Sequence, residues 1–66
     1  MPTSEQLLES TIKDYDQWVQ SHVRLSLQSY LDQGWAIRSA RVAEWEEAFF
    51  FTLKRQDQVD FVKITY

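Results

Sequence analysis

The only glycine in this 66-residue chain, Gly34, separates two segments with different hydrophobic patterns. Before Gly34, apolar side chains recur every three or four residues, which is the spacing of one helical face. These residues are Leu8, Ile12, Tyr15, Val19, Val23, Leu27 and Tyr30. After Gly34, the sequence is rich in Trp, Ile, Val, Phe, Thr and Tyr, which favour strands. Because glycine commonly follows the end of a helix, the chain is predicted to be an α+β protein with its helix before its strands.

The first segment is predicted to form one long helix over about residues 4–33. Thr3 and Gln6 have the spacing of a capping box at its start, and Ser4 is a rival N-cap. No Gly or Pro interrupts the segment. A continuous or mildly bent helix is therefore favoured over a broken one.

This helix is too long for the domain that it belongs to. Residues 4–32 would span about 43 Å as a straight helix, whereas a compact domain of this size is about 28 Å across. Three outcomes are open. The helix breaks near Gln20–His22, its end overhangs and pairs with a second copy, or its first turns fray until a partner binds.

The second segment is predicted to form a three-stranded antiparallel β-meander, so that the overall order is αβββ. The predicted strands cover about residues 35–45, 48–55 and 59–66. Turns are expected near Glu46–Glu47 and at Gln56–Gln58. The alternation of the first strand falls out of phase after Ile37, and a bulge near Ser39 would restore it.

Large apolar side chains are predicted on both faces of this sheet. In the second strand, alternation places Phe49 and Phe51 on one face and Phe50 on the other. A single helix covers only one face of such a sheet, so the other face is left for a partner. Trp, Tyr and Arg are frequent anchors of interfaces, and exposed apolar patches mark them. The candidate partner-binding residues are Trp18, Arg38, Arg41, Trp45, Phe50, Phe61 and Tyr66.

The sequence offers few groups for catalysis. It has no Cys, one His and one Gly, which excludes disulfides, Cys-ligated metals and glycine-rich phosphate loops. His22 is interpreted as a structural or surface residue because no nucleophile pattern accompanies it. The acidic pairs Asp14/Asp16 and Glu46/Glu47 are interpreted as solvated charges. We therefore expect a protein that is not an enzyme and that needs no cofactor or metal.

The net charge of the chain helps to distinguish between the possible classes of partner. The formal net charge of −3 argues against nucleic acid as the default partner. A single-stranded nucleic-acid binder is nevertheless an alternative, because basic residues and aromatic rings alternate in the sheet half. These basic residues are Arg38, Arg41, Lys54, Arg55 and Lys63. A second alternative is a sensor that holds a small apolar ligand between helix and sheet.

One domain over residues 1–66 is expected at this length. No apolar run is long enough to predict a membrane span, and the first residues lack the pattern of a signal peptide, so a cytoplasmic location is expected. A domain this small has little core, and association with another chain would stabilise it. The sequence predicts a non-enzymatic protein-binding module, such as a small adaptor, inhibitor or regulatory subunit. We expect it to form a homodimer through the exposed sheet face or the long helix.

Overall fold

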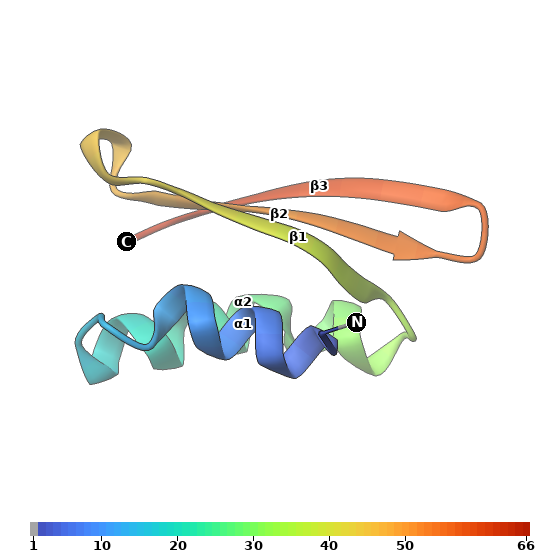
Figure 1. The fold of residues 1–66 in the computed structure, drawn as a ribbon, viewed down its shortest axis with the longest axis horizontal. Helices are drawn as coiled ribbons and strands as arrows, with labels where there is room; N and C mark the ends of the chain where they lie inside the picture. Colours follow the sequence, from blue (N-terminus) through green and yellow to red (C-terminus); the bar gives the residue numbers. More distant parts are fainter. Residues whose placement is uncertain (1) are drawn as a thin grey trace.

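Residues 2–66, which the computed structural model describes, fold as two helices packed on one face of a three-stranded antiparallel sheet (Figure 1). This arrangement confirms the predicted α+β class. The helices are α1 (Ser4–Ile12) and α2 (Gln17–Asp32). The strands have the same order in the sheet as in the sequence and are β1 (Ala36–Ala43), β2 (Ala48–Arg55) and β3 (Gln58–Thr65). A short 3-10 helix, η1 (Glu44–Glu46), joins β1 to β2.

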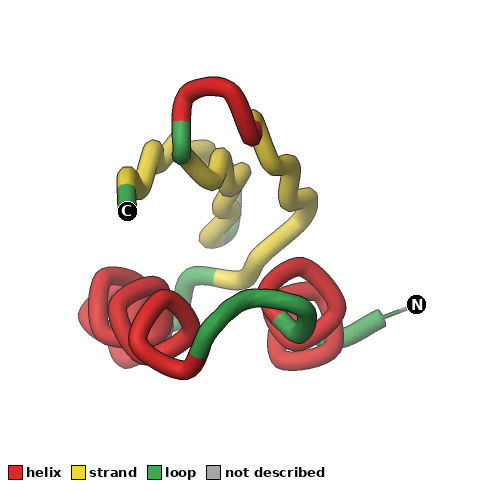
Figure 2. Tube along the Cα trace, turned by 90° about the vertical axis from the view of Figure 1, so that its left-hand side faces the viewer, coloured by secondary structure: helices red, strands yellow, loops and turns green. Residues whose placement is uncertain are grey.

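The prediction of a single long helix is wrong, because the chain turns back between α1 and α2. The break lies at residues 13–16, upstream of the possible break near Gln20–His22. In this turn the Tyr15 ring packs edge-on against Phe49, with ring centroids 4.9 Å apart. The side-chain amide of Gln20 also donates a hydrogen bond to the carbonyl oxygen of Tyr15 (2.8 Å). Lying side by side, the two helices fit beneath the sheet (Figure 2), and the longest dimension of the molecule is 32 Å.

The start of α1 and the end of α2 are capped as the sequence predicts. The Thr3 hydroxyl accepts a hydrogen bond from the Gln6 amide nitrogen (3.1 Å), and the Gln6 side chain accepts one from the Thr3 amide nitrogen (2.8 Å). Gly34 follows α2 with a φ of 90°, which favours glycine. The Trp35 amide then donates to the carbonyl oxygen of Tyr30 (3.1 Å), the long bond of a Schellman motif. These bonds satisfy groups that a helix end leaves unpaired.

The core lies between the helix layer and the sheet, with β2 at its centre. Phe49 and Phe51 point from β2 toward the helices and are fully buried. Burying one such ring contributes about 1.5–3 kcal/mol. The other buried apolar residues of the described chain are Leu8, Ile12, Val19, Val23, Leu27, Ile37, Ala43, Ala48, Leu53 and Ile64. The predicted helical stripe therefore faces the sheet, although it is divided between two helices.

The register of the sheet confirms the predicted bulge in β1. Ile37 pairs with Leu53, whereas Ser39 pairs with Thr52, so Arg38 is the extra residue in β1. A bulge of this kind shifts the alternation of side chains by one residue. The bulge therefore restores the alternation of β1, so that beyond Arg38 its apolar side chains again face the core and its polar side chains face away from it.

Both turns differ from the prediction at their boundaries with the strands. The first strand ends at Ala43 instead of residue 45 because Glu44–Glu46 form η1. The third strand begins at Gln58, directly after a two-residue turn. Both turns place a non-glycine residue in the left-handed region, namely Glu47 with a φ of 51° and Gln56 with a φ of 54°. This conformation costs about 1–2 kcal/mol for a residue with a side chain.

Ion pairs join the two helices at the surface of the helix layer. Arg24 of α2 donates hydrogen bonds to Glu5 (2.9 Å) and Glu9 (2.6 Å) of α1, and so joins the two helices. Exposed ion pairs of this type each contribute less than about 1 kcal/mol. Neither α1 nor α2, which are the helices of the described residues, combines the length and the hydropathy that a membrane span requires.

Candidate functional site

The sheet face turned away from the helices has no cover from the described residues (Figure 1). We call this surface the outer face. Its side chains alternate with core side chains along each strand. Its residues are Ser39, Arg41, Phe50, Thr52, Lys54, Val59, Phe61 and Lys63. The outer face therefore combines apolar, hydroxyl and basic groups on one rigid support.

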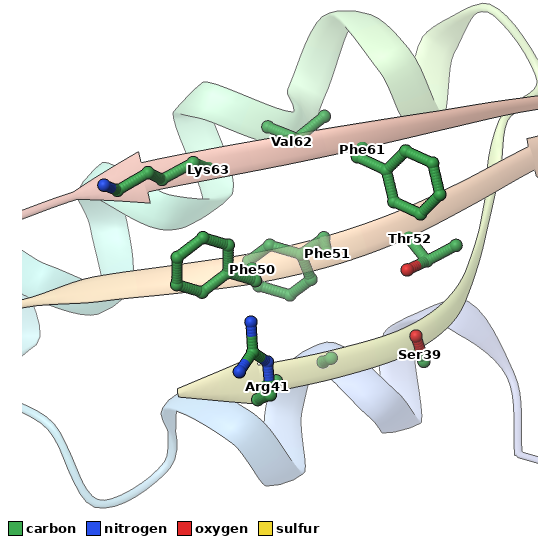
Figure 3. Close-up of a pocket in the computed structure, with 9 residues that line it drawn as sticks. Ser39, Arg41, Phe50, Phe51, Thr52, Phe61, Val62 and Lys63 are labelled. Atoms are coloured by element: carbon green, nitrogen blue, oxygen red, sulfur yellow. The ribbon is translucent and has the colours of Figure 1, made fainter. Parts of the chain in front are cut away.

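A row of three residues, one from each strand, gives the outer face its charge. Arg41, Phe50 and Lys63 are register partners across the sheet. The guanidinium carbon of Arg41 lies 4.7 Å from the centroid of the Phe50 ring, and the Lys63 Nζ lies 5.6 Å from it (Figure 3). A cation over an exposed aromatic ring gains about 0.5–1 kcal/mol. The Phe50 ring therefore holds two positive charges at fixed places on the face.

A second row, Ser39, Thr52 and Phe61, lies beside the first row. The Phe61 ring is 76% exposed to solvent. An open groove of about 660 Å³ lies over both rows, and the residues that line it include no carboxylate. In Figure 3 the Phe61 ring and the Thr52 hydroxyl lie on one side of the groove, and Phe50 lies on the other. This arrangement suits an elongated ligand that presents both apolar and negatively charged groups.

The η1 helix closes one end of the outer face. It rises from the sheet on the side away from α1 and α2 (Figure 1). A carboxylate oxygen of Glu46 lies 3.5 Å from the Lys63 Nζ. The neighbouring Trp45 is 82% exposed. Glu46 therefore supplies an internal counter-charge to Lys63, and Trp45 of the same short helix is a further exposed apolar side chain.

The β1 edge of the sheet is protected in two ways. The bulge at Arg38 interrupts its hydrogen-bonding pattern. The Ser4 hydroxyl accepts a hydrogen bond from the amide nitrogen of Ile37 (2.9 Å), although Ser4 was a rival N-cap in the sequence. Bulges and side-chain caps reduce the tendency of an edge to pair with another strand.

The β3 edge is also capped by side chains. The alternating bonds of an antiparallel pair turn the backbone groups of Val59, Phe61, Lys63 and Thr65 outward. The Asp60 carboxylate accepts a hydrogen bond from the Phe61 amide nitrogen (2.9 Å). The His22 Nε2 of α2 lies 2.8 Å from the Thr65 carbonyl oxygen, to which it donates. Because each edge is capped over part of its length, strand addition is hindered, and the outer face is the broad surface that the described residues leave open.

The remaining candidate residues lie elsewhere. Trp18 is 61% exposed on α2, on the same helical face as Leu25, which is 76% exposed. Arg38 lies at the β1 edge. The Tyr66 ring packs on the core side, 5.0 Å from the Phe49 ring. The structure therefore brings three candidates together in the outer face, Arg41, Phe50 and Phe61, and places Trp45 in η1 beside one end of it.

The titratable side chains of residues 2–66 do not gather into a group of three or more metal-binding residues. Asp14 and Asp16 lie in the turn between the helices and not within a helix. Glu46 is bonded to Lys63, and the His22 ring is engaged in the cap at Thr65. Each of these groups therefore lies in a turn or already has a bonding partner within the fold.

Comparison with known proteins identifies no relative, because the chain matches no family model, no curated protein and no solved structure. The functional argument therefore depends on the chemistry of the outer face. That chemistry consists of exposed rings, cations beside an aromatic ring and partly capped sheet edges.

Proposed function

We propose that this chain is a non-enzymatic protein-binding module that contacts its partner through the outer face. The observation that carries the proposal is a second sheet face with exposed apolar side chains and no covering layer within the described residues. Phe61 and Val59, which are 76% and 54% exposed, form its apolar part. Contact with a partner would remove this surface from water, which is favourable. Aromatic and arginine side chains are also the commonest interface anchors.

Self-association stays a prediction, and its basis has changed. Of its two grounds, the overhanging helix does not exist, since α1 and α2 lie side by side, whereas the uncovered sheet face does. Besides the outer face, which the sequence also offers for self-association, the α2 surface with Trp18 and Leu25 is a candidate for contact with a second copy. Light scattering after size exclusion measures the oligomeric state directly. If a dimer forms there, Trp18→Glu should dissociate it while Phe61→Glu should not.

Site-specific photo-crosslinking in the cells that encode the chain tests binding through the outer face. A benzoylphenylalanine at position 61 replaces an exposed ring with a similar one, so the core is preserved. We expect a discrete protein adduct from this position. The matched control carries the same group at exposed Lys13, in the helix layer, and should give none. An adduct with nucleic acid, or no adduct from position 61, would contradict the proposal.

A further inference from the structure

Building on the proposed function, we infer that the partner lays an extended acidic segment across the outer face. In this arrangement the carboxylates of the segment bind Arg41 and Lys63, and an apolar side chain of the segment packs on Phe61. Three features of the molecule carry this inference: the size of the face, its charge, and the contact that Glu46 already makes. The size of the face argues against a globular partner, and its charge and the Glu46 contact argue for an acidic one.

The size of the outer face favours an extended segment over a globular surface. Three strands of eight residues give a face of about 14 by 26 Å, or about 360 Å² in projection. A stable interface between two globular proteins needs about 800 Å² on each partner. Two copies placed face to face would also bring the same cations to both sides: Arg41, Lys54 and Lys63.

The charge of the outer face favours an acidic occupant. Its cations are held over Phe50, and no carboxylate lines the groove. Glu46 shows that a carboxylate reaches this place, because its side chain bridges to Lys63 at 3.5 Å. Both groups of this bridge are partly exposed, at 39% for Glu46 and 49% for Lys63. Such a pair is weak, so a carboxylate from a partner can replace Glu46.

A protein segment fits the face better than a single-stranded nucleic acid. Nucleic-acid platforms stack bases on open aromatic rings, but two cations lie over the ring of Phe50. Phe61 is then the open ring among the residues that line the groove. The chain as a whole is also negative, at −3, and repels a polyanion outside the groove. A short acidic segment needs only the local positive charge.

Selection from a displayed library of random peptides of about ten residues, long enough to cross the face along a strand, tests the inference. We expect enrichment of peptides in which Asp and Glu flank aliphatic or aromatic residues. Binding of a selected, fluorescein-labelled peptide is then measured by anisotropy. The double variant Arg41→Gln, Lys63→Gln should weaken binding at least about tenfold, because it removes two charge-assisted contacts. A control that loses a charge in the helix layer, Lys13→Gln, should change binding less than about threefold.

The variant Glu46→Gln gives an effect of opposite sign. It removes the internal competitor for Lys63, so the same peptide should bind about twofold to fivefold more tightly. Enrichment of basic or uncharged peptides, no enrichment, or no response to the Arg41 and Lys63 changes would overturn the inference. So would binding of a thymidine oligonucleotide in place of peptides. Because crosslinking at position 61 reports protein contact of any composition, these failures are distinguishable from a failure of the proposed function.

Discussion

The rings of Tyr15 and Phe49 meet edge to face, with centroids 4.9 Å apart and planes inclined at 68°. Tyr15 lies in the turn between α1 and α2, and Phe49 lies on the central strand of the sheet. Tyr66 joins the same cluster, 5.6 Å from Tyr15. Such pairs contribute about 0.5–1.5 kcal/mol beyond the burial of their area. The cluster therefore anchors the helical turn to the sheet.

We expect Tyr15→Ala to lower the free energy of unfolding by about 2–4 kcal/mol, somewhat less than for a fully buried ring. The variant loses both the ring contacts and the anchor of the turn. Tyr15→Phe is the control, because it keeps the ring and should cost less than about 1 kcal/mol. Urea unfolding followed by circular dichroism measures both values. Equal losses in the two variants would show that the ring does not hold the turn.

The same residue predicts how stability depends on pH. Burial, followed by the neighbouring Tyr66 side chain, raises the pKa of Tyr15 from 10.0 to about 12. Between these values the unfolded chain has released the proton and the folded chain still holds it. The unfolded state then binds fewer protons, so the free energy of unfolding falls as pH rises through this window. Below pH 10 this contribution is fully present.

Thermal unfolding of the wild type and of Tyr15→Phe over about pH 9 to 12 measures this contribution. Other groups also titrate in this range, and they are the same in both proteins. We therefore expect the difference in melting temperature between the wild type and the variant to change steadily above pH 10, with the wild type losing more. Parallel curves would contradict the raised pKa of Tyr15.

The break between the helices could not be predicted from hydrophobic spacing. The apolar residues on its two sides, Ile12 and Val19, are both buried and belong to one continuous helical pattern through Tyr15. The turn contains no Gly or Pro that would mark a break. It is fixed by the contact of Tyr15 with a strand that follows much later in the sequence. The mismatch between helix length and domain size was the available signal.

The faces of the sheet could be predicted because side-chain alternation follows directly from strand geometry. Alternation placed Phe50 opposite Phe49 and also required a bulge near Ser39. It did not give the register between strands. The row of Arg41, Phe50 and Lys63 depends on that register, so Lys63 was named only among the basic residues of the nucleic-acid alternative and not as a partner-binding candidate. Leu25, exposed beside Trp18 on α2, was also missed.

A glycine in the turn between β2 and β3 is expected to stabilise the fold. Gln56 has a φ of 54°, which glycine adopts without a steric penalty. We expect Gln56→Gly to raise the free energy of unfolding by about 0.5–1 kcal/mol, since greater freedom in the unfolded chain offsets part of the gain. The adjacent Asp57→Gly is the control and should be neutral or destabilising. Chemical unfolding compares them, and equal effects would exclude relief of strain at Gln56.

The side-chain caps on the sheet edges are predicted to hinder the pairing of an edge strand with a strand of another copy. In Asp60→Ala the amide nitrogen of Phe61 loses its acceptor at the β3 edge. A free donor on an exposed edge favours pairing with a second strand. Its bond to another chain is worth about 1 kcal/mol, so association should begin at about fivefold lower concentration than in the wild type.

Asp57→Ala provides the matched control, because it removes the same charge from the neighbouring turn without uncapping the edge. Light scattering over a concentration series compares the two variants with the wild type. Adding His22→Ala to Asp60→Ala should strengthen association further, since it frees the carbonyl oxygen of Thr65 on the same edge. If the uncapped variants and the control associate at the same concentration, the caps do not protect the edge, and the preference for the outer face over strand addition loses its physical basis.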